Sequence, residues 1–351
     1  MKCGKIRDWF GHVRKKHYLC TRFMKNIDDI RLLIGGEWQD FVRAFSDTLN
    51  SSDNALLRDV AEYLLQRQGK QLRPLLVLLS ARLCGSINEK TIDTAVAMEL
   101  LHTASLVHDD VVDASPLRRG LPSVQARWTN KVAVLTGDYL LAKVIEITAR
   151  LRNLKVLNIV AEMCKALASG ELLQLHVKSG MWLSEKEYYQ VIGQKTAALF
   201  AACTQAGAVS TGASPRMETA LRTYGRELGI VFQMKDDLID WSDSVDSGKP
   251  TMNDIRDGKA TLALLVSLQR APKEEAAEIR RLAESLNGAE SNPEAEQALL
   301  SFVLRYDGIR YVQQQMEQHK RKAIEALSVF HDSSIKAALI QILEFTISRV
   351  A

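Results

Sequence analysis

The sequence lacks the long apolar runs of a membrane protein, because no hydrophobic stretch approaches the roughly 18 residues that a membrane-spanning helix needs. It is also poor in proline, with 7 residues, and in aromatic residues, at 6%, whereas leucine and alanine are frequent. This composition favours an all-α fold. The chain has 351 residues, 46% of them hydrophobic, which is enough for one large domain or two ordinary ones.

The cysteines are few and scattered, at positions 3, 20, 84, 164 and 203. No pair has the CxxC spacing of a zinc or redox site, and an odd number disfavours a disulfide framework. Free thiols are typical of a reducing compartment. We therefore expect a cytoplasmic protein.

Positive charge is concentrated at the start of the chain. The net charge is +4, but residues 1–23 hold seven Lys and Arg against one acid, Asp8, so the remainder has a net charge of −2. By charge, the body of the protein is therefore not a nucleic-acid binder. Residues 1–23 could be a disordered extension, a targeting peptide or a segment that contacts anionic lipid headgroups. We expect residues 24–351 to form the helical domain.

The stretch ELLHTASLVHDDVVDASPLRRG, residues 99–120, places three carboxylates at the end of an apolar run. Asp109, Asp110 and Asp113 can share a helix face, because residues three and four apart are neighbours there. Such close like charges repel each other unless a cation lies between them. FQMKDDLIDW repeats the pattern with Asp236, Asp237 and Asp240.

Two such clusters predict a site for hard divalent cations such as Mg²⁺, with a substrate phosphate completing the ligand shell. A single DDxxD would more often be a solvated helix face. Both clusters here have apolar neighbours, as in LVHDDVVD and VFQMKDDLID, and a solvated face does not have such neighbours.

Basic and polar residues near these clusters are candidates for binding phosphate. Lys70 and Arg73 project from a turn before a buried helix, and Arg118 and Arg119 follow the helix break at Ser115–Pro116. These cations suit diphosphate oxygens. The alternatives are a solvated basic turn and arginines that merely neutralise the aspartates.

Further candidates lie on the expected helices and in one polar loop. His102 precedes Asp109 by seven residues, two turns away on the same face, and Lys195 with Thr196 opens a run of small residues. Lys195 could instead lay its stem along the surface. Lys249 and Lys259 lie in a polar loop that could close over a bound phosphate.

Periodicity predicts helices throughout the chain and no convincing strand. In the first segment Trp38, Phe41, Val42 and Phe45 recur at helical spacing, and Ser52 and Asp53 are plausible N-caps for the next helix. The expected helical ranges are residues 27–68, 74–83, 89–113, 128–150, 154–175, 185–207, 216–241 and most of 262–351.

The ordered motifs GKQLRP, LLHTASLVHDDVVD, RRG, QKT, FQMKDDLID and GKP resemble the trans-type polyprenyl diphosphate synthases from about residue 27 onward. One departure is that the family's GGKRLRP has Gln68 and Gln71 here. The resemblance implies an all-α isoprenoid-synthase bundle around a deep central cavity, usually a homodimer. It also implies repeated condensation of isopentenyl diphosphate with an allylic diphosphate, and it leaves open a peripheral membrane contact for product release.

The resemblance also implies roles for individual residues. Mg²⁺, as three ions bound with the allylic diphosphate, would be held by Asp109, Asp110, Asp113, Asp236 and Asp240, with Asp237 beside them. Isopentenyl diphosphate would be bound by Lys70, Arg73, His102 and Arg119. The allylic diphosphate would be bound by Arg118, Lys195, Thr196, Gln233, Lys249 and Lys259, and Lys195 also counts with the six aspartates as catalytic.

Product length is predicted from the helix before the first cluster. Ala104 and Ser105, one turn deeper than the aspartates, are small, and Leu101 lies lower. A Phe or Tyr there would form a floor near the metals, and each helical turn of about 5.4 Å matches roughly one isoprene unit. We therefore predict a long-chain product, of the kind used for quinone side chains.

Other activities remain open at this point. A short-chain farnesyl or geranylgeranyl diphosphate synthase, or the catalytic subunit of a heteromeric synthase, would carry the same motifs. A terpene cyclase or head-to-head condensing enzyme would not need Lys70, Arg73, His102 and Arg119. A non-catalytic partner subunit could lose aspartates, and this chain keeps all six.

Overall fold

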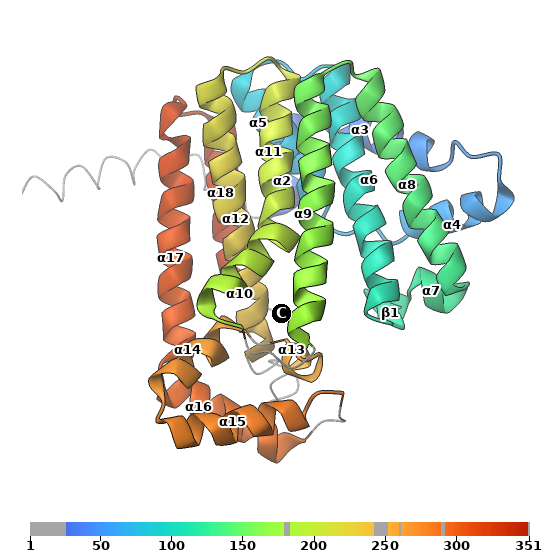
Figure 1. Ribbon diagram of the computed structural model, residues 1–351. Helices are drawn as coiled ribbons and strands as arrows, with labels where there is room; N and C mark the ends of the chain where they lie inside the picture. The colour runs from blue at the N-terminus through green and yellow to red at the C-terminus, as the bar shows by residue number, and fades with distance from the viewer. Residues whose placement is uncertain (1–25, 179–182, 242–251, 260, 289–291, 350–351) are drawn as a thin grey trace, which may run out of the picture. The chain divides into compact units, whose positions relative to one another are not determined.

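The computed structural model describes residues 26–178, 183–241, 252–259, 261–288 and 292–349 (Figure 1). The chain divides into two compact units. Unit 1 contains the described residues up to Met163 together with Phe200–Thr223 and Leu327–Ile342; unit 2 contains those of Cys164–Leu199, Tyr224–Ala326 and Leu343–Ala351. Among the described residues, no helix has the length and apolarity to cross a membrane.

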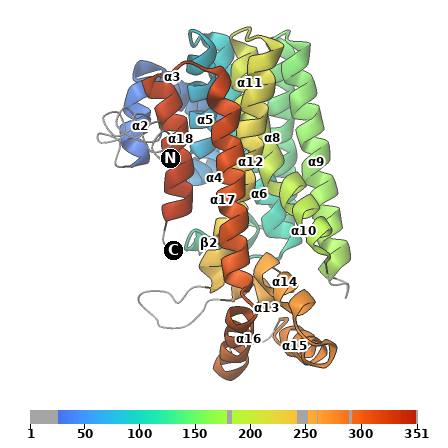
Figure 2. The same ribbon diagram turned by 90° about the vertical axis from the view of Figure 1, so that its left-hand side faces the viewer.

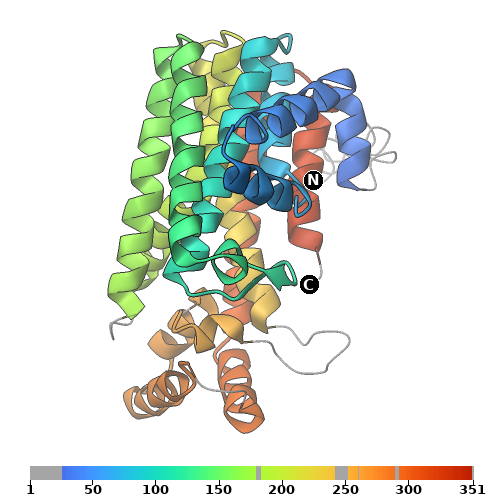
Figure 3. The same cartoon turned by 90° about the vertical axis from the view of Figure 1, so that its right-hand side faces the viewer.

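Unit 1 is helical apart from one small hairpin. Its elements are α2 (Ile27–Ile34), α3 (Gly36–Leu49), α4 (Ala55–Leu65), α5 (Leu72–Cys84), α6 (Glu89–Val112), β1 (Leu117–Arg118), β2 (Leu121–Pro122), α7 (Val124–Arg127), α8 (Asn130–Arg150) and the 3₁₀ turn η2 (Leu327–Val329). It also holds parts of α9 (Leu154–Lys178), α11 (Ala198–Ser210), α12 (Pro215–Trp241) and α18 (Ser334–Ser348). Helices α6 and α8 run side by side (Figures 1 and 3).

Helices α5 and α6 form the centre of unit 1 because they are apolar around most of their circumference. Every residue from Leu75 to Ala81 is buried, and so is every residue from Ala95 to Leu101. A helix with this pattern has to be surrounded by other elements. Helix α3 has the one-sided pattern of a covering helix, with Trp38, Phe41 and Phe45 buried.

Local capping explains where several of these helices begin. Asn88 forms a capping box with Thr91 at the start of α6, which satisfies backbone N–H groups that the helix leaves unpaired. The N-cap of α4 is Asn54, whose side chain accepts from the Leu57 N–H, so the prediction of Ser52 or Asp53 was wrong. Both candidates lie one or two residues too early for that bond.

The β1–β2 hairpin corrects the prediction that the chain has no strand. Leu117 pairs with Pro122, and Arg118 pairs with Leu121. The two residues between the strands, Arg119 and Gly120, have φ of 53° and 75°, and positive φ at both central positions suits the twist of a two-residue hairpin loop. Two-residue strands leave no hydrophobic periodicity for sequence analysis to detect.

Unit 2 is helical in all the parts that the structure describes. It contains α10 (Glu185–Ile192), the π-helical segment η1 (Gly193–Ala197), α13 (Asn253–Arg256), α14 (Leu262–Arg270), α15 (Lys273–Ser285), α16 (Pro293–Arg305) and α17 (Gly308–Ala326), with the remaining parts of α9, α11, α12 and α18. Helix α14, buried from Leu262 to Leu268, contacts α15, α16 and α17 (Figure 2).

The all-α class predicted from composition and periodicity is confirmed. The predicted helices over residues 89–113, 128–150, 154–175 and 216–241 agree with the structure to within a few residues, whereas the predicted helical range 27–68 is divided into three helices. The predicted helix over residues 185–207 is interrupted by η1, a change that apolar periodicity does not reveal. The predicted division into residues 1–23 and 24–351 stays a prediction, since residues 1–25 lie outside the described part of the chain.

Helices α5 and α11 approach so closely that they require glycine at position 207. A Cβ on Gly207 would lie 2.3 Å from the Val77 carbonyl oxygen. We expect Gly207→Ala to lower the free energy of unfolding by about 1–3 kcal/mol, because backbone has to move to relieve the overlap. Denaturant unfolding measures this change. Gly36→Ala is the matched control, since a Cβ there would meet nothing within 4 Å, and an equal loss in both variants would contradict the packing argument.

Candidate active site

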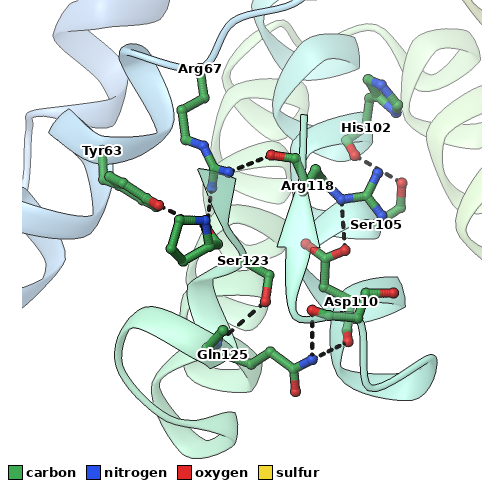
Figure 4. A network of polar contacts seen from close by, with 11 residues as sticks. Tyr63, Arg67, His102, Ser105, Asp110, Arg118, Ser123 and Gln125 are labelled. Carbon is green, nitrogen blue, oxygen red and sulfur yellow. Dashed lines mark hydrogen bonds and ion pairs between the residues drawn. The ribbon is translucent and has the colours of Figure 1, made fainter. Parts of the chain in front are cut away.

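A charged pocket of about 60 Å³ lies in unit 1 between α4, α6 and the hairpin segment. Its charged and imidazole side chains are Arg67, Glu99, His102, Asp110, Arg118 and Arg119. Figure 4 shows Arg67, Asp110 and Arg118 close together. The pocket therefore brings together His102 and Arg119, two of the four residues predicted to bind isopentenyl diphosphate, and also Arg118.

Helix α6 supplies Glu99, His102 and Asp110 from one face, because eleven residues complete close to three turns. Burial raises the pKa of Glu99 to about 7, although Arg73 and Arg119 partly offset this effect. Burial, with help from the same arginines, lowers the pKa of His102 well below its usual range. At neutral pH His102 is therefore a neutral imidazole that can donate a hydrogen bond to a ligand oxygen.

The hairpin supplies the two adjacent arginines. Arg118 donates from Nε to Asp110 Oδ1 at 2.6 Å, so the first acidic cluster already has a cation on one of its carboxylates. Arg119 donates from Nη1 to the Arg67 carbonyl at 2.5 Å. Its guanidinium packs against Gly69, where a Cβ would lie 2.5 Å from Arg119 Nη2. A side chain at position 69 would therefore displace the Arg119 guanidinium.

Arg73 and Lys70, the other two residues predicted to bind isopentenyl diphosphate, are not among the residues that line the pocket. Arg73 is near enough to lower the pKa of His102, and its guanidinium lies over the Phe200 ring, 5.1 Å from the centroid. Lys70 is exposed, and its carbonyl accepts from Arg31 Nη2 at 2.6 Å. The structure therefore fixes the backbone at Lys70 and leaves its ammonium group on the surface.

A second pocket, of about 150 Å³, lies within unit 2. It contains four residues predicted to bind diphosphate, Lys195, Thr196, Gln233 and Lys259, together with Asp237, which was predicted to be catalytic. Gln174, Tyr188 and Asp254 also line it. Lys249, predicted to act with Lys259, lies outside the described residues.

Asp237 is the most confined carboxylate of this second pocket. It accepts from the Tyr188 hydroxyl at 2.6 Å and from Gln233 Nε2 at 3.0 Å. Burial and the charge of Asp254 nevertheless raise the pKa of Asp237 to about 7. Two hydrogen bonds thus stabilise the carboxylate without compensating for its desolvation and the neighbouring negative charge.

Lys195 and Thr196 lie in the π-helical segment η1, a distortion often found at functional sites. Lys195 Nζ is 2.5 Å from Glu171 Oε2 and donates to Gln174 Oε1 at 3.2 Å. The Thr196 hydroxyl donates to Gln233 Oε1 at 2.8 Å. Lys195 therefore points into a polar surrounding instead of laying its stem along the surface.

The remaining carboxylates of the second cluster bind groups of the protein. Asp236 Oδ1 is 2.6 Å from Arg349 Nη2. Asp240 accepts from the backbone N–H groups of Asn253 and Asp254, both at 2.9 Å, and so fixes the start of α13. Burial and the charge of Asp240 raise the pKa of Asp254 to about 6.

The donor chemistry of both clusters suits a hard divalent cation. Within the described residues, no three His, Cys, Asp or Glu side chains are grouped as metal ligands. Asp237 and Asp254 nevertheless have raised pKa values caused in part by neighbouring carboxylates, and a cation would relieve that repulsion. Metal binding by Asp109, Asp110, Asp113, Asp236 and Asp240 stays a prediction.

Three residues of these pockets were missed by sequence analysis. Tyr188 is 49 residues from its hydrogen-bond partner Asp237, and Asp254 follows a polar loop. Arg67 precedes the motif GKQLRP, in which Lys70 and Arg73 were the predicted cations. Tyr188 resembles an ordinary apolar position on α10. Only Asp254 carried a local indication, because NDIRDGK repeats acids beside Lys259.

Comparisons with known proteins agree with this geometry. The family model described as polyprenyl synthetase matches residues 54–301. The octaprenyl diphosphate synthase of Haemophilus influenzae is 35% identical over 93% of this chain and 98% of its own length. A short chain isoprenyl diphosphate synthase of Methanothermobacter thermautotrophicus is 34% identical over 89% of this chain and 99% of its own.

A solved structure matches at a similar level. The polyprenyl synthase of Caulobacter crescentus CB15, complexed with calcium and isoprenyl diphosphate, superimposes with a TM-score of 0.83 at 35% identity, covering 93% of this chain and 98% of that one. The residues that form both pockets, apart from Phe45 and Leu49, lie inside the matched family region. The chain therefore belongs to the polyprenyl synthetase family and is a trans-prenyltransferase.

Proposed function

We propose that this prenyltransferase condenses isopentenyl diphosphate repeatedly with an allylic diphosphate and makes a long-chain all-trans polyprenyl diphosphate. The observation that carries the proposal is the composition of the two pockets. Each combines cationic donors with buried carboxylates contributed by the motif residues. Diphosphates bound through divalent cations require this combination of groups.

The unit-1 pocket suits isopentenyl diphosphate. Arg119 presents an exposed guanidinium, Arg73 adds positive charge, and neutral His102 can donate one hydrogen bond. Arginine binds phosphate oxygens in a planar, bidentate geometry. The Caulobacter relative, whose structure contains isoprenyl diphosphate, supports the assignment of a diphosphate ligand to this family.

The unit-2 pocket suits the allylic diphosphate and its ionisation. When the C–O bond breaks, negative charge concentrates on the leaving diphosphate, and fixed donors stabilise it. Lys195, Lys259 and the Thr196 hydroxyl line the pocket and can supply such donors. Mg²⁺ held by the aspartates would supply further stabilisation of the same leaving group. The departing diphosphate is a suitable acceptor for the proton that isopentenyl diphosphate loses.

A long product is supported by the residues of α6 and by one relative. Ala104 is completely buried, Leu101 is 1% exposed, and the Ser105 hydroxyl bonds to the His102 carbonyl within the same helix. None of them has the size to form an aromatic floor. The Haemophilus relative is an octaprenyl diphosphate synthase. The Methanothermobacter relative keeps the short-chain alternative open.

Several parts of the proposal rest on the family alone. These are the homodimer, a supply of quinone side chains, a peripheral membrane contact and the use of three Mg²⁺ ions. The cytoplasmic location rests on the scattered cysteines. The alternative of a catalytic subunit in a heteromeric synthase has the same motif residues, so only the behaviour of the isolated chain separates the two.

The purified chain alone, with Mg²⁺, isopentenyl diphosphate and farnesyl diphosphate, should release products longer than geranylgeranyl diphosphate. Chromatography of the dephosphorylated products measures their length. A chelator should abolish turnover, because the aspartates then lack the cations that offset their charge. A product that stops at the geranylgeranyl stage would exclude the long-chain assignment, and an inactive lone chain would favour the heteromeric alternative.

Asp237→Asn should remove a pH dependence of stability measured in chelator. The folded Asp237 has a pKa of about 7, against about 4 unfolded. Between these values the folded carboxyl holds a proton that the unfolded chain releases, so wild-type stability falls as pH rises from about 4 to 7. The free energy of unfolding of the variant should therefore exceed that of wild type by about 2–4 kcal/mol at pH 8, and the two should be equal near pH 4.

Denaturant unfolding at both pH values gives this difference. Asp257→Asn, at an exposed position near the same pocket, is the control and should track wild type. Adding Mg²⁺ should narrow the gap, since a nearby cation stabilises the charged carboxylate. If the difference in free energy of unfolding between variant and wild type did not change with pH, ionisation of Asp237 would not be what destabilises the folded protein.

Ala104→Phe should shorten the product by one or more isoprene units, because an aromatic ring one turn below Asp109 reduces the depth available to the growing chain. Chromatography with wild type in parallel measures the change. Since Ala104 is completely buried, melting curves must accompany the assay. An active, folded variant with unchanged product length would place the floor elsewhere.

A further inference from the structure

Arg67 connects the turn after helix α4 to the β1–β2 hairpin. It lies two residues after α4 and is half-buried. Its Nη1 donates to the Pro122 carbonyl at 2.7 Å, and its Nη2 donates to the Arg118 carbonyl at 2.5 Å. Figure 4 shows the second of these bonds beside the Arg118–Asp110 pair. One side chain is thus bonded to both strands of the hairpin.

The hairpin needs such external support because it has little stability of its own. Each strand has two residues, and an isolated two-stranded hairpin is marginal in water. Leu117 and Leu121 are 59% and 47% exposed, so burial does not fix the strands. Arg119 has a positive φ of 53°, which costs a residue other than glycine roughly 1–2 kcal/mol.

Arg67 also accepts a hydrogen bond from the hairpin. The Arg67 carbonyl accepts from Arg119 Nη1 at 2.5 Å. Arg67 therefore fixes the backbone on both sides of Arg119 and also the direction of the Arg119 side chain. The first two contacts use the Arg67 side chain and the third uses its backbone carbonyl, so a hairpin released by the side chain would also shift Arg119 relative to that carbonyl.

Arg67 lines the pocket, and the hydrogen bonds that its guanidinium makes are directed at the hairpin. Both terminal nitrogens are bonded to backbone carbonyls, and within the described residues its Nε is buried without a hydrogen-bond partner. Arg119 differs, because it is exposed and, in the same part of the chain, only its Nη1 has a hydrogen bond. The Arg119 guanidinium can therefore offer further donors to a phosphate group.

Tyr63 holds the Arg67 side chain in place. The Arg67 guanidinium lies over the Tyr63 ring, 4.5 Å from the centroid, and cation–π contacts of this kind restrain a guanidinium. The Tyr63 hydroxyl donates to the Pro122 carbonyl at 2.7 Å, the same oxygen that accepts from Arg67. Arg127 also lies over this ring, at 4.2 Å, and has no hydrogen bond to the hairpin carbonyls among the described contacts.

We propose that Arg67 is a positioning residue: it holds the hairpin and the Arg119 side chain where they receive the diphosphate of isopentenyl diphosphate. This inference rests on the proposed function of the unit-1 pocket. It assigns to the end of helix α4 a role in substrate affinity that acts through the hairpin. The crowding of Arg67, Arg118 and Arg119 also leaves excess positive charge that a diphosphate would balance.

Calorimetric binding of isopentenyl diphosphate tests the proposal without requiring turnover. Arg67→Ala should weaken binding about 10-fold or more, because the charge-assisted contact of a displaced Arg119 is lost. Arg67→Lys should recover little of this affinity, since one ammonium group cannot reproduce the planar fork that reaches two carbonyls. Tyr63→Phe removes only the hydroxyl contact and should have a smaller effect.

Hydrogen–deuterium exchange over residues 117–123, without any ligand, is the second readout. It should accelerate in Arg67→Ala and stay at the wild-type rate in Arg127→Ala, the matched control that removes a cation from the same ring. In steady-state assays Arg67→Ala should raise the KM for isopentenyl diphosphate and leave the KM for the allylic substrate nearly unchanged.

The outcomes separate this inference from the proposed function. If wild type elongates and binds isopentenyl diphosphate while Arg67→Ala, folded by its melting curve, binds equally well, the positioning role is wrong and the function stands. If wild type binds but does not elongate, the function fails and the binding and exchange comparisons still decide the role of Arg67. The proposal would also be overturned if Arg67→Ala and Arg127→Ala changed the binding of isopentenyl diphosphate and the exchange of residues 117–123 equally.

Discussion

Helix α6 carries ionisable side chains through an apolar interior, and the arrangement of the unit-1 pocket depends on that constraint. Glu99 lies within the buried stretch of the helix and Asp110 near its end. Burying a carboxylate without a counter-charge is expensive, so such groups are paired or become neutral. Arg73, Arg118 and Arg119 provide the counter-charges, but the Glu99 pKa of about 7 shows that compensation is partial. The pocket thus has more cation than ionised carboxylate, which suits a diphosphate.

The pocket of unit 2 has the opposite imbalance. Lys195 already has Glu171 beside it at 2.5 Å, and Lys259 has Asp257 at 2.9 Å. The carboxylate of Asp237 has neutral donors, Tyr188 and Gln233, and faces the charge of Asp254. Negative charge is therefore in excess there. Divalent cations would correct this excess, and a diphosphate bound with them could then engage the two lysines.

The sequence could predict the features that depend on local pattern. Asp109 and Asp236 each open a DDxxD at the end of an apolar helix, and helical spacing alone places His102 on the face of Asp109. The all-α class followed from composition. Such features need no knowledge of which helices meet, so periodicity and residue type suffice.

Other features depend on contacts between segments distant in sequence. The bond from Tyr188 to Asp237 joins two helices with no shared local pattern, and the pairing of Asp236 with Arg349 spans more than a hundred residues. The π-helical segment at Lys195 differs from an α-helix in hydrogen bonding, not in apolar period. Gly170 illustrates the difficulty, because a Cβ at this position would lie 3.0 Å from the Cβ of Gln194. Only that approach explains why the position requires a small residue.

The β1–β2 hairpin shows how a strained local conformation can be imposed from outside. Its adjacent arginines favour neither a positive φ at Arg119 nor strand pairing, so the sequence predicted an ordinary loop there. The cost of that backbone conformation is roughly 1–2 kcal/mol, and net gains of about 1 kcal/mol for each neutral hydrogen bond can offset it when several act together. Arg67 and Tyr63 supply three hydrogen bonds to the hairpin carbonyls. The geometry of Arg119 is therefore determined in part by residues of α4 and its following turn, whose own sequence contains no sign of that contact.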